Sequence, residues 1–335
     1  MFNDTRSLPR AHRAAITLLA LAMMLALAGI AQAQQRDPNL SLQHSVLDET
    51  FRSYRFERFT VQSADEQRRW RVTLGIPREA TPDTGFPAFW MLDGNAALME
   101  FDAPLLEELG DQLDSPVLVF VGYDNDLRID PARTRDYTFA MDPYRSDDTP
   151  PKRIGGGADA FLEVIERTIR PEIARRVATD PSRQTLWGHS FGALFALHTL
   201  YTRSGAFTTY AAGSPSLWWA DGALLGEPEA RFRANNAGHP ARVLLSMGGG
   251  ERERDTRHRD MSDPRVQAHL RRVANAPPDS TVRLAERLNQ VAGLDVTYRE
   301  FPELTHGLTF RASLMDALHE TTGITDYSST RGTLR

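Results

Sequence analysis

The sequence predicts an α/β fold built on a doubly wound, mostly parallel sheet with an N-terminal antiparallel hairpin. Two early segments alternate apolar and polar residues, two later segments are apolar throughout, and helix-like segments separate the strands that follow. Alternation with a period of two is typical of half-exposed antiparallel strands, whereas continuous apolar runs are typical of strands buried on both faces of a parallel sheet. Strands that alternate with helices indicate the doubly wound arrangement.

The hairpin is expected at residues 52–61 and 69–76, which carry the alternating pattern on either side of the charged turn 63–67. The first buried strands are expected at 87–92 and 116–121, because both segments are apolar throughout. Later strands and helices follow from the same criteria. In chain order they are helix 96–113, helix 158–178 with a break or bend near Pro171, strand 184–187, helix 193–201, strands 208–212 and 241–246, helix 282–292, strand 295–301 and helix 308–318.

The segment 124–157 has no sustained period and is rich in proline and glycine. A stretch this long inside one domain is usually a functional loop or a disordered one. We therefore expect it to form an irregular loop or lid.

Residues 1–33 have the organisation of a secretory signal peptide. Three arginines precede an uncharged run over 14–30, and the small-residue box Ala31-Gln-Ala33 follows. A membrane anchor is the alternative, but the run is near the lower length limit of a spanning helix. We expect cleavage after Ala33, a single domain over 34–335 with no membrane span, and a periplasmic or secreted location.

Charge and cysteine content narrow the functional classes. The chain has 39 basic and 44 acidic residues, and loss of the signal peptide removes three of the former and one of the latter, which leaves a net charge of −7. Such a chain has no basic excess with which to engage phosphates, so nucleic acid is not an expected partner. It contains no cysteine, which excludes a lipoprotein and disulfides. The sequence leaves the oligomeric state open.

The segment Gly188-His-Ser-Phe-Gly192 is the strongest functional motif. It contains G-x-S-x-G between a predicted strand and a predicted helix, where the serine of a nucleophile elbow lies on a strained turn with its hydroxyl exposed. A tight Gly-Ser turn without catalytic function is the alternative. The context favours Ser190 as a nucleophile and the α/β-hydrolase form of the predicted fold.

A serine hydroxyl needs a base to accept its proton, and in this fold the chain order is serine, acid, histidine. His306 follows a predicted strand and precedes a predicted helix, which places it at the carboxyl edge of the sheet where ligands bind. We expect it to be the general base; a helix-capping role is the alternative.

The acid is less defined. The predicted strand 241–246 is followed by three glycines and then by Glu251, Glu253 and Asp255, any of which could orient the imidazole. The same charge run could form a solvated loop, which leaves a Ser-His dyad.

An oxyanion hole requires two backbone N–H groups directed at the developing charge. One is expected from Phe191, the residue after the nucleophile. The other is expected from the loop after the first buried strand, where Gly94 permits close backbone approach. Asn95 is the first candidate there and Gly94 the second.

Several segments together resemble a known family. They span nearly the whole chain after residue 33, and the two most specific are Met91-Leu-Asp-Gly-Asn95 and Phe301-Pro-Glu-Leu-Thr-His-Gly307. The chain resembles the Gram-negative periplasmic esterases that cleave the catecholate siderophores enterobactin and salmochelin, within the "Putative esterase" branch of the α/β-hydrolase superfamily. Other matching segments are 54–56, 121–123, 135–138, 155–157, 186–195, 213–218 and 311–314.

The resemblance implies a serine esterase that needs no metal or other cofactor and that opens the trilactone ester bonds of a catecholate siderophore through an acyl-enzyme. Some members keep Gly-x-x-Glu after the equivalent strand, which matches Gly250-Glu-Arg-Glu253 and makes Glu253 the first choice of acid, with Glu251 the alternative. The periplasmic salmochelin enzyme lacks an acid there, so the resemblance supports both a triad and a dyad.

A ferric trilactone is strongly anionic, so cationic and aromatic side chains are expected to bind it. The alternative for each is a solvated or a core position. The candidates are Arg133, Arg135, Lys152, Arg153 and Trp218.

Other functions stay open at this point. A broader carboxylesterase for feruloyl or acetyl esters would use the same residues, and so would an acyltransferase of the same fold. A siderophore-binding protein without catalysis is the least favoured, because nucleophile, base and oxyanion segments are all present. The sequence does not distinguish ferric from iron-free substrate, or the number of ester bonds cleaved.

Overall fold

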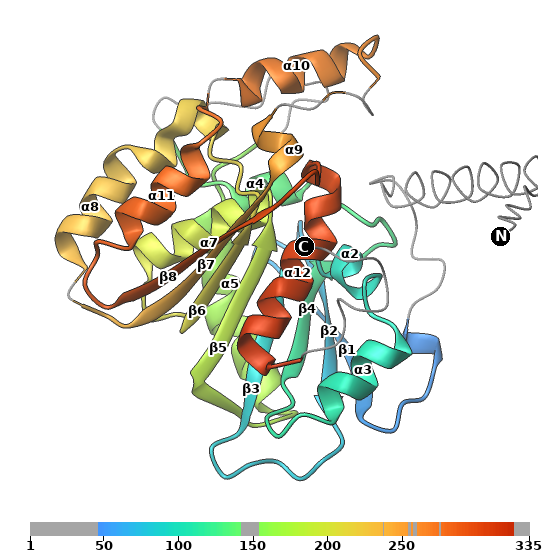
Figure 1. The fold of residues 1–335 in the computed structure, drawn as a ribbon. Helices are drawn as coiled ribbons and strands as arrows, with labels where there is room; N and C mark the ends of the chain where they lie inside the picture. The colour runs from blue at the N-terminus through green and yellow to red at the C-terminus, as the bar shows by residue number, and fades with distance from the viewer. Residues whose placement is uncertain are drawn as a thin grey trace, which may run out of the picture. The chain divides into compact units, whose positions relative to one another are not determined.

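One mixed sheet organises the described part of the chain (Figure 1), in the strand order β1-β2-β4-β3-β5-β6-β7-β8. β1 pairs antiparallel with β2 and β2 antiparallel with β4, whereas the later neighbours are parallel, which confirms the predicted fold class and hairpin. The strands are β1 (Tyr54–Gln62), β2 (Arg69–Pro77), β3 (Phe86–Met91), β4 (Val117–Tyr123), β5 (Thr179–His189), β6 (Thr209–Gly213), β7 (Ala241–Gly248) and β8 (Leu294–Phe301).

The structure is a computed structural model that describes residues 46–141, 154–236, 238–253, 256, 260–274 and 276–324. These residues belong to one compact unit, Pro38–Arg335. The predicted signal peptide at 1–33 lies outside the described residues and stays a prediction. In the described part, no helix combines the length and apolar character that crossing a bilayer requires.

Helices cover both faces of the sheet. One core cluster joins α2, α3 and α12 to side chains such as Phe120 and Trp187, and the other joins α5, α6, α7, α8 and α11 to the opposite face. The helices are α2 (Gly94–Leu98), α3 (Ala103–Gly110), α4 (Arg133–Tyr137), α5 (Ala158–Val164), α6 (Arg170–Ala174), α7 (Phe191–Thr202), α8 (Glu227–Asn235), α9 (Gly249–Arg252), α10 (Pro264–Val273), α11 (Ser280–Leu288) and α12 (His306–Thr322).

Three expected elements differ from the structure. The single helix predicted at 96–113 is two helices, because Asp102 adopts an extended backbone and its side chain accepts the Leu105 N–H, which starts α3 afresh. The helix at 158–178 does not break at Pro171 but continues into α6 through a π-helical turn. The irregular segment 124–157 contains α4.

The winding direction of the sheet reverses at β3. After β3 the chain adds β4 on one side of β3 and then returns to add β5 on the other side, so β3 and β5 are neighbours in the sheet. The connections that follow these two strands leave in opposite directions. In open α/β sheets the crevice outside the carboxyl ends of such strands is where ligands bind. Residues that directly follow β3 and β5 are therefore positioned to form a site.

Candidate active site

Ser190 occupies a strained turn between β5 and α7. Its backbone has φ 61° and ψ −114°, a conformation that a residue with a side chain rarely adopts and that costs about 1–3 kcal/mol. The turn is so tight that a Cβ at Gly188 would lie 2.3 Å from the carbonyl carbon of Gly192. The predicted elbow is therefore present in the structure, with glycine where the backbone is most crowded.

His306 reaches Ser190 across 116 positions of sequence. It is the first residue of α12, which follows β8, and its Nε2 lies 3.0 Å from Ser190 Oγ. The same oxygen lies 3.1 Å from Ser216 Oγ. The alcohol and the imidazole are thus within proton-transfer distance, as the sequence predicts.

Glu251 completes a line of three groups. Its Oε2 lies 2.6 Å from His306 Nδ1, and its Oε1 accepts hydrogen bonds from Ser214 Oγ at 2.5 Å, Thr309 Oγ1 at 3.1 Å and the Gly248 N–H at 3.2 Å. Both carboxylate oxygens therefore have hydrogen-bond partners, and the carboxylate can hold one ring orientation of the imidazole.

The first-choice acid, Glu253, does not reach the imidazole. It is the C-terminal cap of α9 and exposed, and its N–H donates to Gly249 O at 3.0 Å. Residues two positions apart on a helix point about 200° apart, so the side chains of Glu251 and Glu253 point to opposite sides of α9 and cannot contact the same partner. The prediction that Glu253 contacts His306 is therefore wrong, and the carboxylate beside His306 is that of the predicted alternative, Glu251.

The environment keeps Glu251 ionised. Burial acts to raise the pKa of this carboxyl, but the His306 imidazole and hydrogen bonds from Ser214 and the Gly248 N–H outweigh it, so the pKa is lowered. An ionised carboxylate only accepts hydrogen bonds, so the proton between the two side chains belongs on Nδ1 of His306. Nε2 is then free to accept the Ser190 proton.

His189, the residue before Ser190, packs against His306. Its ring centroid lies 4.7 Å from that of His306 and 5.4 Å from that of Phe310, and the residue is 6% exposed. Burial, His306 and the Arg133 guanidinium lower the pKa of His189 well below its usual value of 6.5. The ring is therefore neutral where an exposed histidine would be charged.

We expect this histidine to make the fold acid-labile. Below pH 6.5 this histidine is protonated in the unfolded chain but stays neutral in the folded chain. The free energy of unfolding therefore falls as the pH is lowered, with a slope approaching about 1.4 kcal/mol per pH unit. Calorimetric melting of wild type and His189→Phe at pH 7.5 and pH 5.0 measures the effect. The wild type should lose more stability over this interval than the variant; equal losses would contradict the assignment.

The expected oxyanion segments both begin helices. Phe191 is the first residue of α7, and Gly94 and Asn95 are the first residues of α2, where N–H groups have no intrahelical acceptor. A Cβ at Gly94 would lie 2.6 Å from the Val121 backbone nitrogen, so only glycine lets this loop lie on β4. The Asn95 side chain anchors the loop by donating to the carbonyl of Leu127 at 3.0 Å.

The loop after β3 also touches the elbow. A Cβ at Gly192 would lie 3.4 Å from Leu92 Cβ and 3.8 Å from Asp93 Oδ2. The two helix starts are therefore adjacent, as an oxyanion hole requires.

The residues expected to bind substrate differ in their exposure and contacts. Arg133 is 7% exposed and ion-paired with Asp93, which lies 40 positions away in sequence. Arg135 is exposed. Trp218 is half-buried, and its ring centroid lies 5.6 Å from that of Phe191, the residue beside the nucleophile. Lys152 and Arg153 lie outside the described residues.

Three contact residues were not predicted individually. Ser214 and Thr309 donate hydrogen bonds to the carboxylate of Glu251, and Ser216 Oγ contacts Ser190 Oγ. The sequence position of each residue indicated that it could lie near the site. The two serines follow β6 at the same carboxyl edge of the sheet, and Thr309 lies one helical turn after His306, on the same side of α12.

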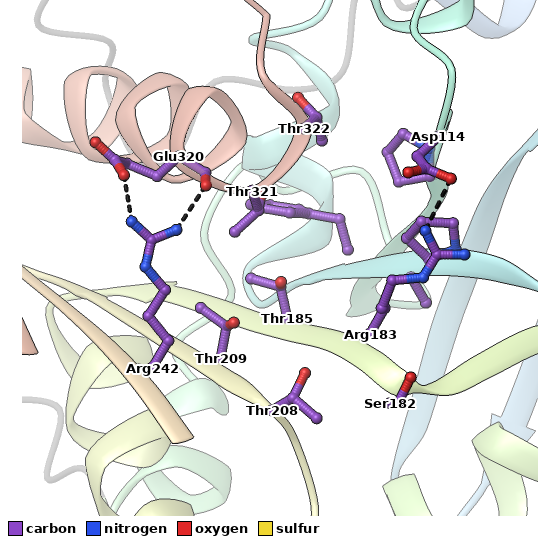
Figure 2. A pocket seen from close by; sticks show the side chains of 14 residues that line it. Asp114, Ser182, Arg183, Thr185, Thr208, Thr209, Arg242, Glu320, Thr321 and Thr322 are labelled. Carbon is purple, nitrogen blue, oxygen red and sulfur yellow. Dashed lines mark hydrogen bonds and ion pairs between the residues drawn. The ribbon is translucent and has the colours of Figure 1, made fainter. Parts of the chain in front are cut away.

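Two cavities lie away from these groups. One of about 350 Å³ opens at the amino ends of the parallel strands, opposite to Ser190, among threonines and the ion-paired Arg183 and Arg242 (Figure 2). The other, of about 430 Å³, lies beside α7 and α8. Among the described residues, no group of three or more His, Asp or Glu side chains is arranged to hold a metal ion.

Comparison with known proteins identifies the family. The "Putative esterase" family matches residues 63–320, which contain Ser190, Glu251 and His306. The chain belongs to this family. It is an α/β-hydrolase-type enzyme that hydrolyses ester bonds.

Relatives of this esterase are similar over most of their length. The apo-salmochelin esterase of Escherichia coli O6:H1 is 30% identical over 289 residues, which cover 85% of this chain and 83% of the relative. The ferri-bacillibactin esterase BesA of Bacillus subtilis is 31% identical over 60% of this chain and 72% of its own. The solved structure of the enterobactin and salmochelin hydrolase IroE superposes with a TM-score of 0.61 at 27% identity, over 83% of this chain and 99% of IroE.

Proposed function

We propose that this esterase hydrolyses the trilactone ester bonds of a catecholate siderophore of the enterobactin or salmochelin type, through an acyl-enzyme on Ser190. The observation that carries the mechanism is the unbroken line from Ser190 Oγ through His306 to Glu251, with separations of 3.0 Å and 2.6 Å. The printed names of the relatives, which include hydrolases of salmochelin and enterobactin, support the substrate class.

The geometry supports a mechanism of acyl transfer. Ser190 Oγ attacks the ester carbonyl carbon while His306 Nε2 takes the hydroxyl proton, and Glu251 stabilises the imidazolium without accepting that proton. The N–H groups of Phe191 and Asn95, with Gly94 as the second candidate, stabilise the oxyanion. His306 then protonates the leaving seryl alcohol, and the acyl-enzyme is resolved when His306 activates water.

The trilactone brings three catechol rings and, when ferric, a large negative charge. Trp218, half-buried against Phe191, offers a ring on which a catechol can stack, and the exposed Arg135 offers a guanidinium. We include Lys152 and Arg153 in the proposal as further cations of the sequence segment 124–157. Export by the predicted signal peptide would place this activity in the periplasm, where iron release from a captured siderophore is useful.

A substrate comparison tests the assignment. Protein lacking residues 1–33 is expected to cleave enterobactin with a kcat/KM at least about 100-fold higher than that for feruloyl sugars or nitrophenyl acetate. The reason is that contacts with the catechols, remote from the reacting ester, can stabilise the transition state. Ferric and iron-free substrate are assayed side by side, and mass spectrometry counts the ester bonds cut. Faster cleavage of the simple esters would favour a general carboxylesterase, and acyl capture by added alcohols would favour an acyltransferase.

A further inference from the structure

The cavity at the amino ends of the parallel strands is lined by a row of polar side chains that crosses three strands. Thr185 of β5 is the register partner of Thr209 of β6, and Thr209 is the partner of Arg242 of β7. Register partners project from the same face of a sheet. Phe89, the partner of Thr185 in β3, belongs to the core cluster that includes α12, so the row faces α12. The last turn of that helix lines the other side of the cavity (Figure 2).

The polarity of this face changes within two residues along each strand. The adjacent row consists of Trp187, Ala211 and Leu244, which pack in the core cluster with α12. Valine would continue that apolar surface, because it has the branched shape of threonine and is also favoured in strands. Thr185 and Thr209 therefore place hydroxyl groups where the packing of the sheet requires none.

The protein itself uses neither hydroxyl. Thr185 and Thr209 are only 7% and 9% exposed, and in the described part of the chain no hydrogen bond joins either Oγ1 to another group of the protein. The neighbouring Thr208 differs, because its Oγ1 donates to the carbonyl of Gln184 at 3.1 Å. Buried hydroxyls normally have hydrogen-bond partners, so these two are available to a molecule that enters the cavity.

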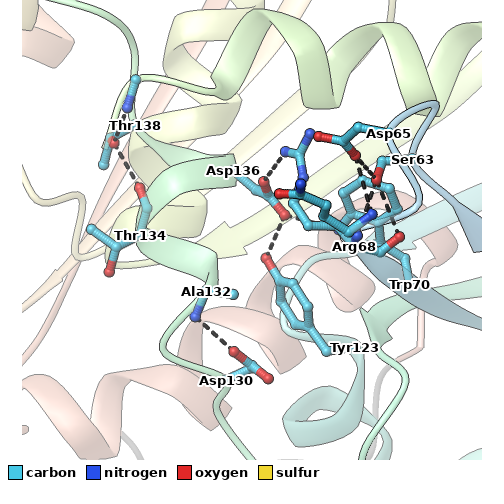
Figure 3. A network of polar contacts seen from close by, with 12 residues as sticks. Ser63, Asp65, Arg68, Trp70, Tyr123, Asp130, Ala132, Thr134, Asp136 and Thr138 are labelled. Carbon is cyan, nitrogen blue, oxygen red and sulfur yellow. Dashed lines mark hydrogen bonds and ion pairs between the residues drawn. The ribbon is translucent and has the colours of Figure 1, made fainter. Parts of the chain in front are cut away.

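Asp136 and Thr138 show how buried polar side chains are satisfied elsewhere in the protein (Figure 3). The Asp136 carboxylate accepts from Trp70 Nε1 and from Tyr123 Oη, each at 2.9 Å. Thr138 Oγ1 donates to the carbonyl of Thr134 at 2.6 Å. Each of these groups is matched by the protein, which is the arrangement that the threonine row lacks.

The charges around the cavity cancel. Arg183 Nη1 lies 2.8 Å from Asp114 Oδ1, whereas Arg242 Nη1 donates to the Glu320 carbonyl at 2.6 Å and its Nη2 donates to the Glu320 carboxylate. Figure 2 shows the two ion pairs on opposite sides of the threonines. An anion would have to displace a carboxylate from a guanidinium, and a cation would have to displace a guanidinium from a carboxylate. A neutral ligand leaves both pairs intact, so the cavity favours one.

We propose that this cavity is a binding site for a neutral polyhydroxy compound of monosaccharide size. Hydroxyl groups of the ligand exchange hydrogen bonds with Thr185 and Thr209, and its C–H groups contact Pro87 and Pro116. The cavity volume of about 350 Å³ lies within the range of about 300–1,000 Å³ that is typical of small-molecule sites. The proposal does not depend on the esterase chemistry, because the cavity lies at the opposite end of the strands from Ser190.

Titrations followed by ligand-observed NMR test the proposal, with glucose and myo-inositol as probes and inorganic phosphate as the anionic comparison. We expect a dissociation constant of about 1 mM for at least one polyol, which is ordinary for a ligand of this size, and weaker binding of phosphate. Thr185→Val/Thr209→Val should raise that constant at least about 10-fold, because two hydrogen bonds are lost. Valine keeps the shape of threonine, so the melting temperature without ligand should not fall. Each single variant gives the same test with a smaller effect if the double variant does not fold.

Thr73→Val is the matched control, because Thr73 is a buried threonine of β2 that does not line the cavity. Its dissociation constants should equal those of wild type. Labelling of Ser190 with a fluorophosphonate should also leave them unchanged, which separates this site from the esterase site. Absence of saturable polyol binding up to about 100 mM, about 100-fold above the expected constant, overturns the proposal. It is equally overturned if the double variant keeps wild-type affinity, if phosphate binds more tightly than the polyols, or if labelling abolishes binding.

Discussion

Replacing Ser190 with alanine should reduce kcat for ester hydrolysis by about 10⁶-fold, the loss typical when the nucleophile of such a site is removed. The expectation follows from the contact between Ser190 Oγ and His306 Nε2, because alanine leaves the base with no oxygen to deprotonate. Stopped-flow assays with a nitrophenyl ester give both the burst of released nitrophenol and the steady rate. Both should vanish in Ser190→Ala, and a fluorophosphonate that labels wild type should no longer attach.

The neighbouring hydroxyl provides the control for that experiment. Ser216 Oγ lies 3.1 Å from Ser190 Oγ, yet the hydrogen bonds of the described residues include none between Ser216 and His306. Ser216→Ala should therefore retain most of the activity and the label. Because residues that act as one unit are not additive, Ser190→Ala/His306→Ala should be no slower than either single variant. Burst kinetics that survive in Ser190→Ala would refute Ser190 as the nucleophile.

Hydrophobic periodicity was sufficient to predict most of the sheet. The central strands β3 and β4 are buried on both faces, so their segments are apolar throughout, whereas β1 alternates because it lies at the edge of the sheet. Ser190 and His306 were predictable for a related reason. Each follows a recognisable strand and precedes a helix, and strand order then brings the carboxyl ends of β5 and β8 to one edge.

The features that the sequence did not predict depend on non-local or weakly encoded contacts. Helix α8 contains few apolar residues, and it is held partly by the ion pair of its buried Glu229 with Arg287, 58 positions away. Arg133 was expected to bind substrate from an irregular segment, with a solvated position as the alternative, because charged residues in such segments are usually exposed. It is buried because Asp93, 40 positions earlier, supplies a compensating carboxylate.

The choice between Glu251 and Glu253 depended on where a four-residue helix begins. Three consecutive glycines favour no regular structure, so nothing local indicated that α9 starts at Gly249. The start of the helix decides which carboxylate turns toward α12. That start is fixed by tertiary contact, since Gly248 and Gly250 pack against the backbone of Leu304, and a Cβ at Gly248 would lie 2.1 Å from its carbonyl oxygen.

We expect Glu251→Gln to lower kcat by about 10³–10⁴-fold with little change in KM. The amide keeps the size of the side chain but presents an N–H or a neutral oxygen to His306 Nδ1, so it neither fixes the productive tautomer nor stabilises the imidazolium that forms in the transition state. The hydrogen bonds from Ser214 and Thr309 to the other oxygen can persist, so the fold should be retained. Steady-state kinetics on enterobactin and on a nitrophenyl ester, with circular dichroism as a check of folding, measure the effect.

Glu253→Gln is the matched control, because it makes the same chemical change two residues away on an exposed side chain. Its kcat should stay within about twofold of wild type, since exposed charges away from the site contribute little. The comparison also decides between a triad and a dyad. In a Ser-His dyad the carboxylate would only support structure, and Glu251→Gln would then lower the melting temperature while leaving kcat nearly unchanged.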